Sequence, residues 1–316
     1  MNAVGIDISR GKSMVAVLRP FGEIVMLPFE VGHSNAELKA LAERLKSIEG
    51  ETRVVMEHTG RYYEPVANAL HNFGLFVSAV NPLLIKEYGG NSLRKVKTDK
   101  ADAQKIARYT LDNWADLRDY SPMDTTRYDL KTLNRQFNLA SKQKTATSNN
   151  LIALLEQTFP GIRKCFESPV RSDGTQKWVD FVITFWHADC VRKYSKEAFA
   201  ERYRKWCKRH GYSVRSDAIN EVYTLAENAV VLVPKFQTAK VIIQEAAKQL
   251  TAVSRSVELY RSEMSRLAST LPEYPVVMQM FGVGNTFGPQ LMAEIGDVRR
   301  FARKQSLVAF AGIDPA

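Results

Sequence analysis

The 316-residue chain has the length and composition of a folded protein with two or three domains. Hydrophobic residues make up 45% of it and charged residues 25%, which excludes a disordered chain. No apolar run is long enough to span a membrane, and charged residues among the first 20 positions interrupt any signal-peptide core. We therefore expect a cytoplasmic protein without a membrane partner.

The formal net charge of +10 favours a polyanionic partner, most often nucleic acid. A basic soluble protein without such a partner is the alternative. The three cysteines, Cys165, Cys190 and Cys207, cannot all pair with one another, so we expect reduced thiols.

The first 115 residues predict a mixed sheet with helices packed on it. Short apolar runs bounded by turn residues predict strands at 4–8, 14–18, 24–29, 53–56 and 75–80. Helices are predicted from Ser34 onward, over 65–73, and from a cap at Thr98 through Leu111. Three adjacent strands followed by crossover units form the RNase H-like order.

Apolar residues recur at heptad spacing in two later segments, which predicts two long helices. The seam positions are Leu130, Leu133, Phe137, Ala140, Lys144, Thr147, Leu151 and Leu154, and then Ala246, Leu250, Val253, Val257, Tyr260, Met264, Leu267 and Leu271. One antiparallel helical hairpin explains both segments, and an intermolecular coiled coil is the alternative. Pro160 and Pro234 mark the edges of the segment between them.

We therefore expect an α/β plus α protein in four parts. An RNase H-like domain takes residues 1–115, and a long coiled-coil linker takes 116–159 and 236–272. A basic insertion takes 160–235, and a small helical C-terminal domain takes 273–316.

Cations and aromatic residues interleave in the basic insertion. The cations expected to contact nucleic acid are Arg202, Arg204, Lys205, Lys208 and Arg209. The aromatic residues among and around them are Tyr194, Phe199, Tyr203, Trp206 and Tyr212. Cations that bind phosphates and rings that stack on bases are typical of proteins that hold single-stranded nucleic acid. The alternative is an amphipathic helix with aromatic core residues and a solvated basic face.

Four acidic residues lie where a metal site can form. Asp7 interrupts an apolar strand, Glu57 ends a second buried strand, and Asp99 and Asp102 share one face at the start of a helix. Mg²⁺ or Mn²⁺ prefers oxygen ligands, and two ions about 3.5–4 Å apart can clamp the oxygens of a phosphoryl transfer. Each acid also has a simpler explanation, as a paired core acid, a loop cap or a helix N-terminal charge.

Nearby cations would bring phosphate groups to these acids. They are Lys95, Lys97, Lys100, Lys105 and Arg108.

Three motifs around the acids resemble those of the DEDD insertion-sequence transposases, the one-ten family that also includes pilin-gene DNA invertases. They are Gly-Ile-Asp-Ile-Ser at 5–9, Met-Glu-His-Thr-Gly at 56–60 and Lys-Thr-Asp-Lys-Ala-Asp-Ala at 97–103. Residues 280–284, 294–297, 300–301 and 311–315 resemble the second conserved domain of that family. The coiled-coil linker fits as well, whereas the insertion matches no part of the family pattern.

The resemblance implies a RuvC-like domain in which Asp7, Glu57, Asp99 and Asp102 bind Mg²⁺ (or Mn²⁺). It implies a recombinase or transposase that cleaves and exchanges DNA strands as a homo-oligomer, a dimer or tetramer. Many members are guided by a structured RNA. The family also uses a serine nucleophile shortly after a Gly-x-x-Pro element, and here that element ends at Pro315. We therefore expect the serine beyond residue 316 and a chain that is catalytically incomplete.

Three other functions stay open on the residues. The first is a RuvC-like structure-specific nuclease that uses the same N-terminal domain. The second is a sugar-kinase-like or actin-like ATPase, although Ser9-Arg10-Gly11-Lys12 makes a poor phosphate loop. The third is a nucleic-acid-binding protein without catalysis.

Two further spacings suggest sites. His187-x-x-Cys190 and Cys207-x-x-His210 have the residue types of a structural zinc site, with ordinary core or surface positions as the alternative. The glycines of 281–284 would let backbone N–H groups approach a phosphate, although a plain helix–turn–helix explains them too.

Overall fold

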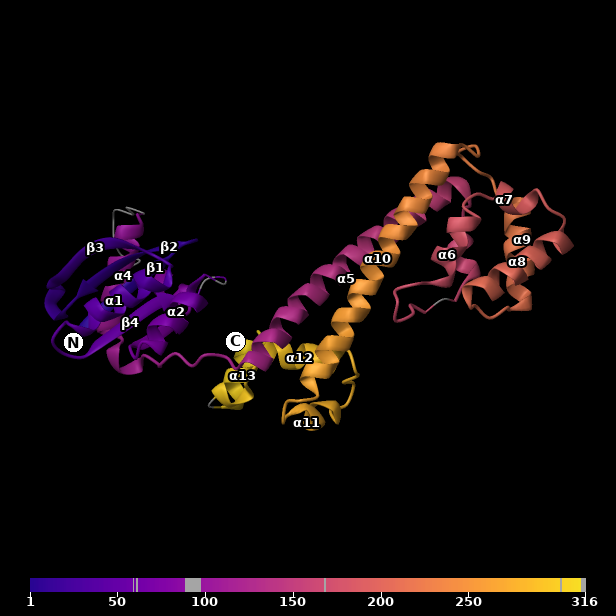
Figure 1. The fold of residues 1–316 in the computed structure, drawn as a ribbon. Coiled ribbons are helices and arrows are strands. Elements are labelled where there is room, and N and C mark those ends of the chain that lie inside the picture. Colours follow the sequence, from indigo (N-terminus) through magenta and orange to yellow (C-terminus); the bar gives the residue numbers. More distant parts are fainter. Residues whose placement is uncertain (59, 61, 89–97, 168, 302, 314–316) are drawn as a thin grey trace. The chain divides into compact units, whose positions relative to one another are not determined.

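The computed structural model describes residues 1–58, 60, 62–88, 98–167, 169–301 and 303–313 (Figure 1). It divides into two compact units, Met1–Pro122 and Met123–Ala316. No helix among these described residues is long and apolar enough to cross a membrane.

In the described part of the first unit, five strands form one mixed sheet in the order β3-β2-β1-β4-β5. The strands are β1 (Asn2–Ile8), β2 (Lys12–Leu18), β3 (Ile24–Gly32), β4 (Thr52–Glu57) and β5 (Phe76–Val80). The first three strands pair antiparallel, whereas β4 runs parallel to β1 and β5 runs parallel to β4. The predicted strands and the mixed sheet are confirmed, and the RNase H-like assignment stays a prediction.

Helices cover both faces of this sheet. They are α1 (Asn35–Lys46), α2 (Tyr63–Asn72), α3 (Pro82–Glu87) and α4 (Asp99–Asp112). Alternate strand residues such as Val4 and Ile6 form a core with α1 and α2, whereas Val55 packs with Ile106 of α4 on the other face. The sheet therefore lies between two helical layers.

Two predicted caps begin the helices that the sequence indicated. The Ser34 hydroxyl accepts a hydrogen bond from the Glu37 N–H at 3.3 Å, and the Thr98 hydroxyl accepts one from the Ala101 N–H at 3.3 Å. Helix α3 was missed because Asn81-Pro82 also fits the end of a strand. The Asn81 side chain in fact caps α3 by accepting from the Leu83 N–H at 3.0 Å, with proline in the first turn.

The second unit contains two long helices, α5 (Thr125–Thr158) and α10 (Gln237–Ala268), which pack against each other (Figure 1). Leu130 near the start of α5 shares a cluster with Met264 near the end of α10, so the pair is antiparallel. Every predicted seam residue is buried or half-buried. The pairing is therefore made within the chain, as the hairpin interpretation expects, while coiled-coil supercoiling stays a prediction.

The segment between these two helices forms a helical subdomain. Its elements are η3 (Ile162–Cys165), α6 (Lys177–Thr184), α7 (Asp189–Arg192), α8 (Lys196–His210) and α9 (Ser216–Asn228). Their apolar side chains share one core with Leu151 and Leu155 of α5 and with Ile243 and Leu250 of α10. The insertion is thus anchored on one end of the hairpin.

The other end of the hairpin holds the C-terminal helices. They are α11 (Tyr274–Met278), α12 (Phe287–Ile295), η4 (Val298–Arg300) and α13 (Lys304–Phe310). Met292 and Ala293 of α12 pack with Leu130 of α5, and Asn134 of α5 donates to the Glu294 carboxylate at 2.6 Å.

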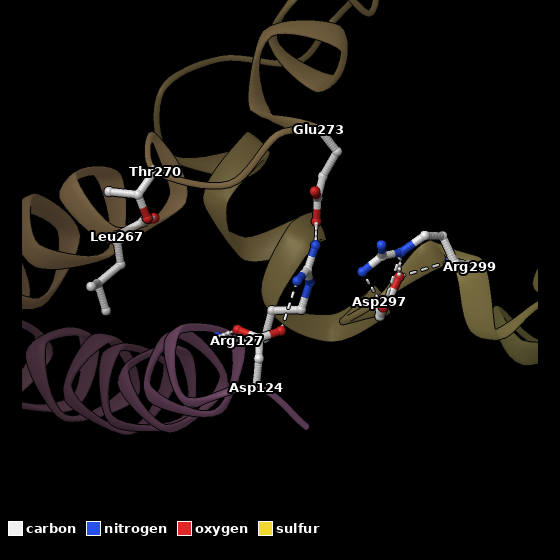
Figure 2. Close-up of polar contacts among 7 residues, drawn as sticks. All are labelled: Asp124, Arg127, Leu267, Thr270, Glu273, Asp297 and Arg299. Carbon is white, nitrogen blue, oxygen red and sulfur yellow. Dashed lines mark hydrogen bonds and ion pairs between the residues drawn. The ribbon is translucent and has the colours of Figure 1, made fainter. Parts of the chain in front are cut away.

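A buried arginine also joins this end of the hairpin to the C-terminal segment (Figure 2). The Arg127 guanidinium donates to Asp124 at 2.7 Å and to Glu273 at 2.6 Å, and its side chain is only 8% exposed. Nearby, hydrogen bonds from Arg299 lower the pKa of Asp297 to about 2. Because Glu273 lies just before α11, the Arg127–Glu273 pair fixes where the chain turns after α10.

We expect Arg127→Ala to lower the free energy of unfolding by about 3 kcal/mol, because it leaves the Glu273 carboxylate without its buried partner. Chemical denaturation monitored by circular dichroism measures this change. Arg135→Ala, at an exposed position of the same helix, is the matched control. An equal, small effect of both substitutions would show that the Arg127 network does not stabilise the second unit.

Candidate functional site

The site begins with a backbone contact between β1 and α4. A Cβ atom on Gly5 would lie 2.2 Å from the carbonyl oxygen of Ala103 and 2.3 Å from the amide nitrogen of Ala107. Only glycine allows a helix to lie this close to a strand. The contact fixes α4 on the sheet just after its first turn, which carries Asp99 and Asp102.

Asp7 and Glu57 lie on the face of the sheet that α4 covers. Asp7 is two residues beyond Gly5, and Glu57 is two residues beyond Val55, so each shares the face of the earlier residue. β1 and β4 are parallel neighbours paired up to Ile6 and Met56, and one further step places Asp7 beside Glu57. Both acids are half-buried.

The electrostatics of Glu57 show that α4 brings another carboxylate, that of Asp102, near this edge. Burial raises the pKa of Glu57, the charge of Asp102 raises it further, and Lys105 opposes the shift. The charge of Asp99 in turn makes a small contribution to the raised pKa of Lys12, which is held mainly by its ion pair with Glu30. The structure thus places Asp7 and Glu57 at the ends of neighbouring strands, Asp102 near enough to act on Glu57, and Asp99 near enough to act on Lys12 of β2.

The carboxylates fit a hard divalent cation in their chemistry, although they do not converge on one point. Among the described residues, no three His, Cys, Asp or Glu side chains already form a group that could hold a metal ion. The chemistry is nevertheless suitable, since carboxylate oxygens are the ligands that Mg²⁺ prefers. A cation would also offset both causes of the raised pKa of Glu57, which are burial and then the charge of Asp102.

The predicted phosphate-binding cations around α4 have different settings. Lys100 and Arg108 are exposed, whereas Lys105 is half-buried and donates to the Lys86 carbonyl at 3.3 Å. Lys95 and Lys97 lie outside the described residues. Lys100 and Arg108 are therefore accessible to a phosphate group, whereas the charge of Lys105 lowers the pKa of Glu57.

The insertion corrects part of the nucleic-acid prediction. Phe199, Tyr203 and Trp206 belong to the buried core of the subdomain, so these rings do not offer their faces to bases. They follow the alternative interpretation, an amphipathic helix with an aromatic core. The five predicted cations are all exposed on α8; they are Arg202, Arg204, Lys205, Lys208 and Arg209.

The zinc interpretation is wrong for the described residues, because its four members serve separate packing roles. His187 is buried, accepts from the Asp189 N–H at 3.0 Å and lies 3.0 Å from the Val233 carbonyl oxygen through its other ring nitrogen. Burial raises the pKa of the Cys190 and Cys207 thiols, which disfavours the thiolate that zinc needs. His210 stacks on the Trp206 ring.

Sequence reasoning missed the part played by Gly5. A glycine within a strand of bulky apolar residues, on the same face as an embedded acid, was the available signal.

We expect Gly5→Ala to destabilise the first unit by about 1–3 kcal/mol, because the added methyl group must push α4 away from β1. Thermal unfolding measures the loss. Gly284→Ala, where an added Cβ meets nothing within 4 Å, is the control and should change stability far less. A tolerated Gly5→Ala would contradict the close contact.

We expect Glu57→Gln to stabilise the protein near neutral pH in the presence of EDTA. Because the folded-state pKa of Glu57 is raised, ionisation of Glu57 costs stability as pH rises through that pKa. The difference in unfolding free energy should be smallest well below pH 4.5 and should grow in favour of the variant at higher pH. Denaturation across this pH range, with the exposed Glu87→Gln as control, measures it. A pH-independent difference would contradict a raised pKa of Glu57 in the folded protein.

Comparisons with known proteins match both units. A family model described as "Transposase", of the DEDD IS110 type, covers residues 4–160, and a second, described as "Transposase IS116/IS110/IS902 family", covers residues 274–316. The Insertion element IS110 uncharacterized 43.6 kDa protein of Streptomyces coelicolor is 22% identical over 312 residues, 99% of this chain and 75% of the relative. The Insertion element IS116 uncharacterized 44.8 kDa protein of Streptomyces clavuligerus is 22% identical over 317 residues, with the same shares.

One family model matches the segment with the acidic motifs, and the other matches the segment with the C-terminal motifs. Each of the two relatives aligns with nearly the whole chain. The chain belongs to the IS110/IS116 family of insertion-element transposases.

Proposed function

We propose that the first unit is an RNase H-like phosphoryl-transfer module that acts on DNA during transposition. Asp7, Glu57, Asp99 and Asp102 would hold Mg²⁺ or Mn²⁺ in it. The observation that carries the proposal is the close contact of α4 with β1 at Gly5, which sets the first turn of α4, with Asp99 and Asp102, against the strand of Asp7. Acidic groups whose pKa is raised by burial and by a neighbouring carboxylate, as that of Glu57 is, cluster at functional sites.

The residues divide the work of the proposed site. When bound, the metal would polarise a phosphoryl oxygen and activate the attacking oxygen. Asp7 and Glu57 would supply carboxylates from two neighbouring strands, and Asp102 would supply one from α4, which packs on the same face of the sheet. Lys100 and Arg108, exposed on α4, can attract the DNA backbone toward the acids.

The second unit would contribute nucleic-acid binding and assembly. The exposed cations of α8 support contact with a phosphate backbone. Homo-oligomeric assembly as a dimer or tetramer and guidance by a structured RNA are parts of the proposal that rest on the family resemblance. The serine nucleophile that the family resemblance implies would share the strand exchange with the acidic residues.

The test is whether the acids bind Mg²⁺. Wild-type protein at ten times its Kd for Mg²⁺ should gain about 1.4 kcal/mol of stability, a rise in the unfolding temperature that depends on Mg²⁺ concentration. Asp7→Asn and Asp102→Asn should lose this gain, because each removes a charged ligand. The exposed Asp129→Asn of α5 should keep it.

The same variants should lose any Mg²⁺-dependent nicking of supercoiled plasmid DNA that wild-type protein shows. A wild-type protein that Mg²⁺ does not stabilise, or an Asp102→Asn variant stabilised as strongly as wild type, would refute the metal site.

A further inference from the structure

A basic pocket opens in the insertion where α6, α7 and α8 meet. Its volume is about 390 Å³, and its lining residues are Thr184, Phe185, Cys190, Lys193, Tyr194, Arg202, Lys205, Trp206 and Arg209. The residues supplied by α8 follow the spacing i, i+3, i+4 and i+7, so they form one face of that helix. All of its lining residues belong to the insertion, in the second unit, whereas the acidic residues belong to the first unit.

Positive charge dominates the pocket rim. Lys193, Arg202, Lys205 and Arg209 all line it, and they are exposed. Of the ion pairs among the described residues, one involves a cation of this rim, the pair of Lys205 with Glu201 at 2.5 Å. Four cations around one concave surface, with so little compensation, favour a ligand with phosphate charge.

An aromatic side chain orders part of this rim. The Arg202 guanidinium lies 4.2 Å from the centre of the Tyr194 ring, and the Lys193 ammonium lies 4.7 Å from it. Tyr194 thus holds two cations in place at the mouth, which reduces the entropy lost when they bind a ligand.

Two aromatic rings form an apolar floor in the pocket. Phe185 and Trp206 are each about 6% exposed. Trp206 stacks with Tyr203, His210 and Tyr212, so the edge of its indole is what remains to line the pocket. The floor therefore offers a small apolar surface against which a base can pack.

We propose that this pocket receives one unpaired nucleotide of a single-stranded nucleic acid. Its phosphates contact Arg202, Lys205 and Arg209, and its base lies against Phe185 and the edge of the Trp206 ring. A base held in a duplex is stacked and paired and cannot enter such a recess, so duplex nucleic acid can reach only the rim. The inference deepens the nucleic-acid role in the proposed function, because it assigns a strand type and a set of residues.

The chain offers two matched double variants, called the pocket pair and the control pair. The pocket pair, Arg202→Gln/Arg209→Gln, removes two cations from the pocket. The control pair, Arg204→Gln/Lys208→Gln, removes two exposed cations of the same helix that do not line it. Both double variants change the net charge equally. Binding is measured by fluorescence anisotropy with single-stranded DNA, single-stranded RNA and duplex DNA of one sequence, at several salt concentrations.

The pocket pair should weaken single-strand binding tenfold or more and lower the slope of log affinity against log salt by about 1.4, roughly 0.7 per lost phosphate contact. The control pair should weaken it less than about threefold, and duplex binding should respond equally to both pairs. Trp206→Phe, which keeps an apolar ring and removes no charge, should leave the salt slope nearly unchanged. Circular dichroism and thermal unfolding check that each variant is folded.

Equal losses from the two pairs, or a pocket pair that binds single strands as wild type does, would overturn the proposal. Tighter binding of RNA than DNA, lost in the pocket pair, would assign the pocket to RNA, and the reverse would assign it to DNA. The metal site is tested by the Mg²⁺-dependent stability of Asp7→Asn and Asp102→Asn, whereas the pocket is tested by the single-strand affinity of the α8 variants. Failure of the metal site and failure of this pocket therefore appear in different variants.

Discussion

The close approach of α4 to β1 at Gly5 is the constraint on which the first unit depends. A strand and a helix normally keep a layer of side chains between them, and here the α4 backbone occupies the place of a Cβ atom. Because Asp7 follows Gly5 on the same face and Asp102 precedes Ala103 on the helix, this contact determines how near the acids come to one another. A packing requirement within the sheet thus sets the geometry of the proposed chemistry.

The cost of this arrangement appears at Glu57. Burial and the charge of Asp102 raise the pKa of its carboxyl group, and Lys105 compensates in part. A divalent cation bound at this edge would relieve that cost, as the proposed function requires. The second unit distributes its charges differently. It pairs Arg127 with two carboxylates inside the fold and leaves the cations of α8 exposed, where they can meet a polyanion.

The sequence predicted the elements whose signals are local, and it failed where distant residues decide. The strands, the Ser34 and Thr98 caps and the heptad seams follow from residue type and spacing. Asn81-Pro82 suited a strand end and a helix start equally, so α3 was missed. A cation-aromatic pattern looks the same whether its rings stack on bases or fill a core, and only tertiary packing placed Phe199 inside. The zinc spacing likewise gave no information on where His187 and Cys207 lie in the fold.

The central claim is that the acids of β1, β4 and α4 jointly bind a divalent cation. Anomalous diffraction from crystals of the 316-residue protein soaked in Mn²⁺ tests it most directly, because it locates the ion without assuming an activity. The account predicts a peak within coordination distance, about 2.0–2.2 Å, of carboxylate oxygens from Asp7 and from Glu57 or Asp102. Mn²⁺ bound only at other carboxylates, with the Asp7 edge of the sheet free of anomalous signal, would contradict it.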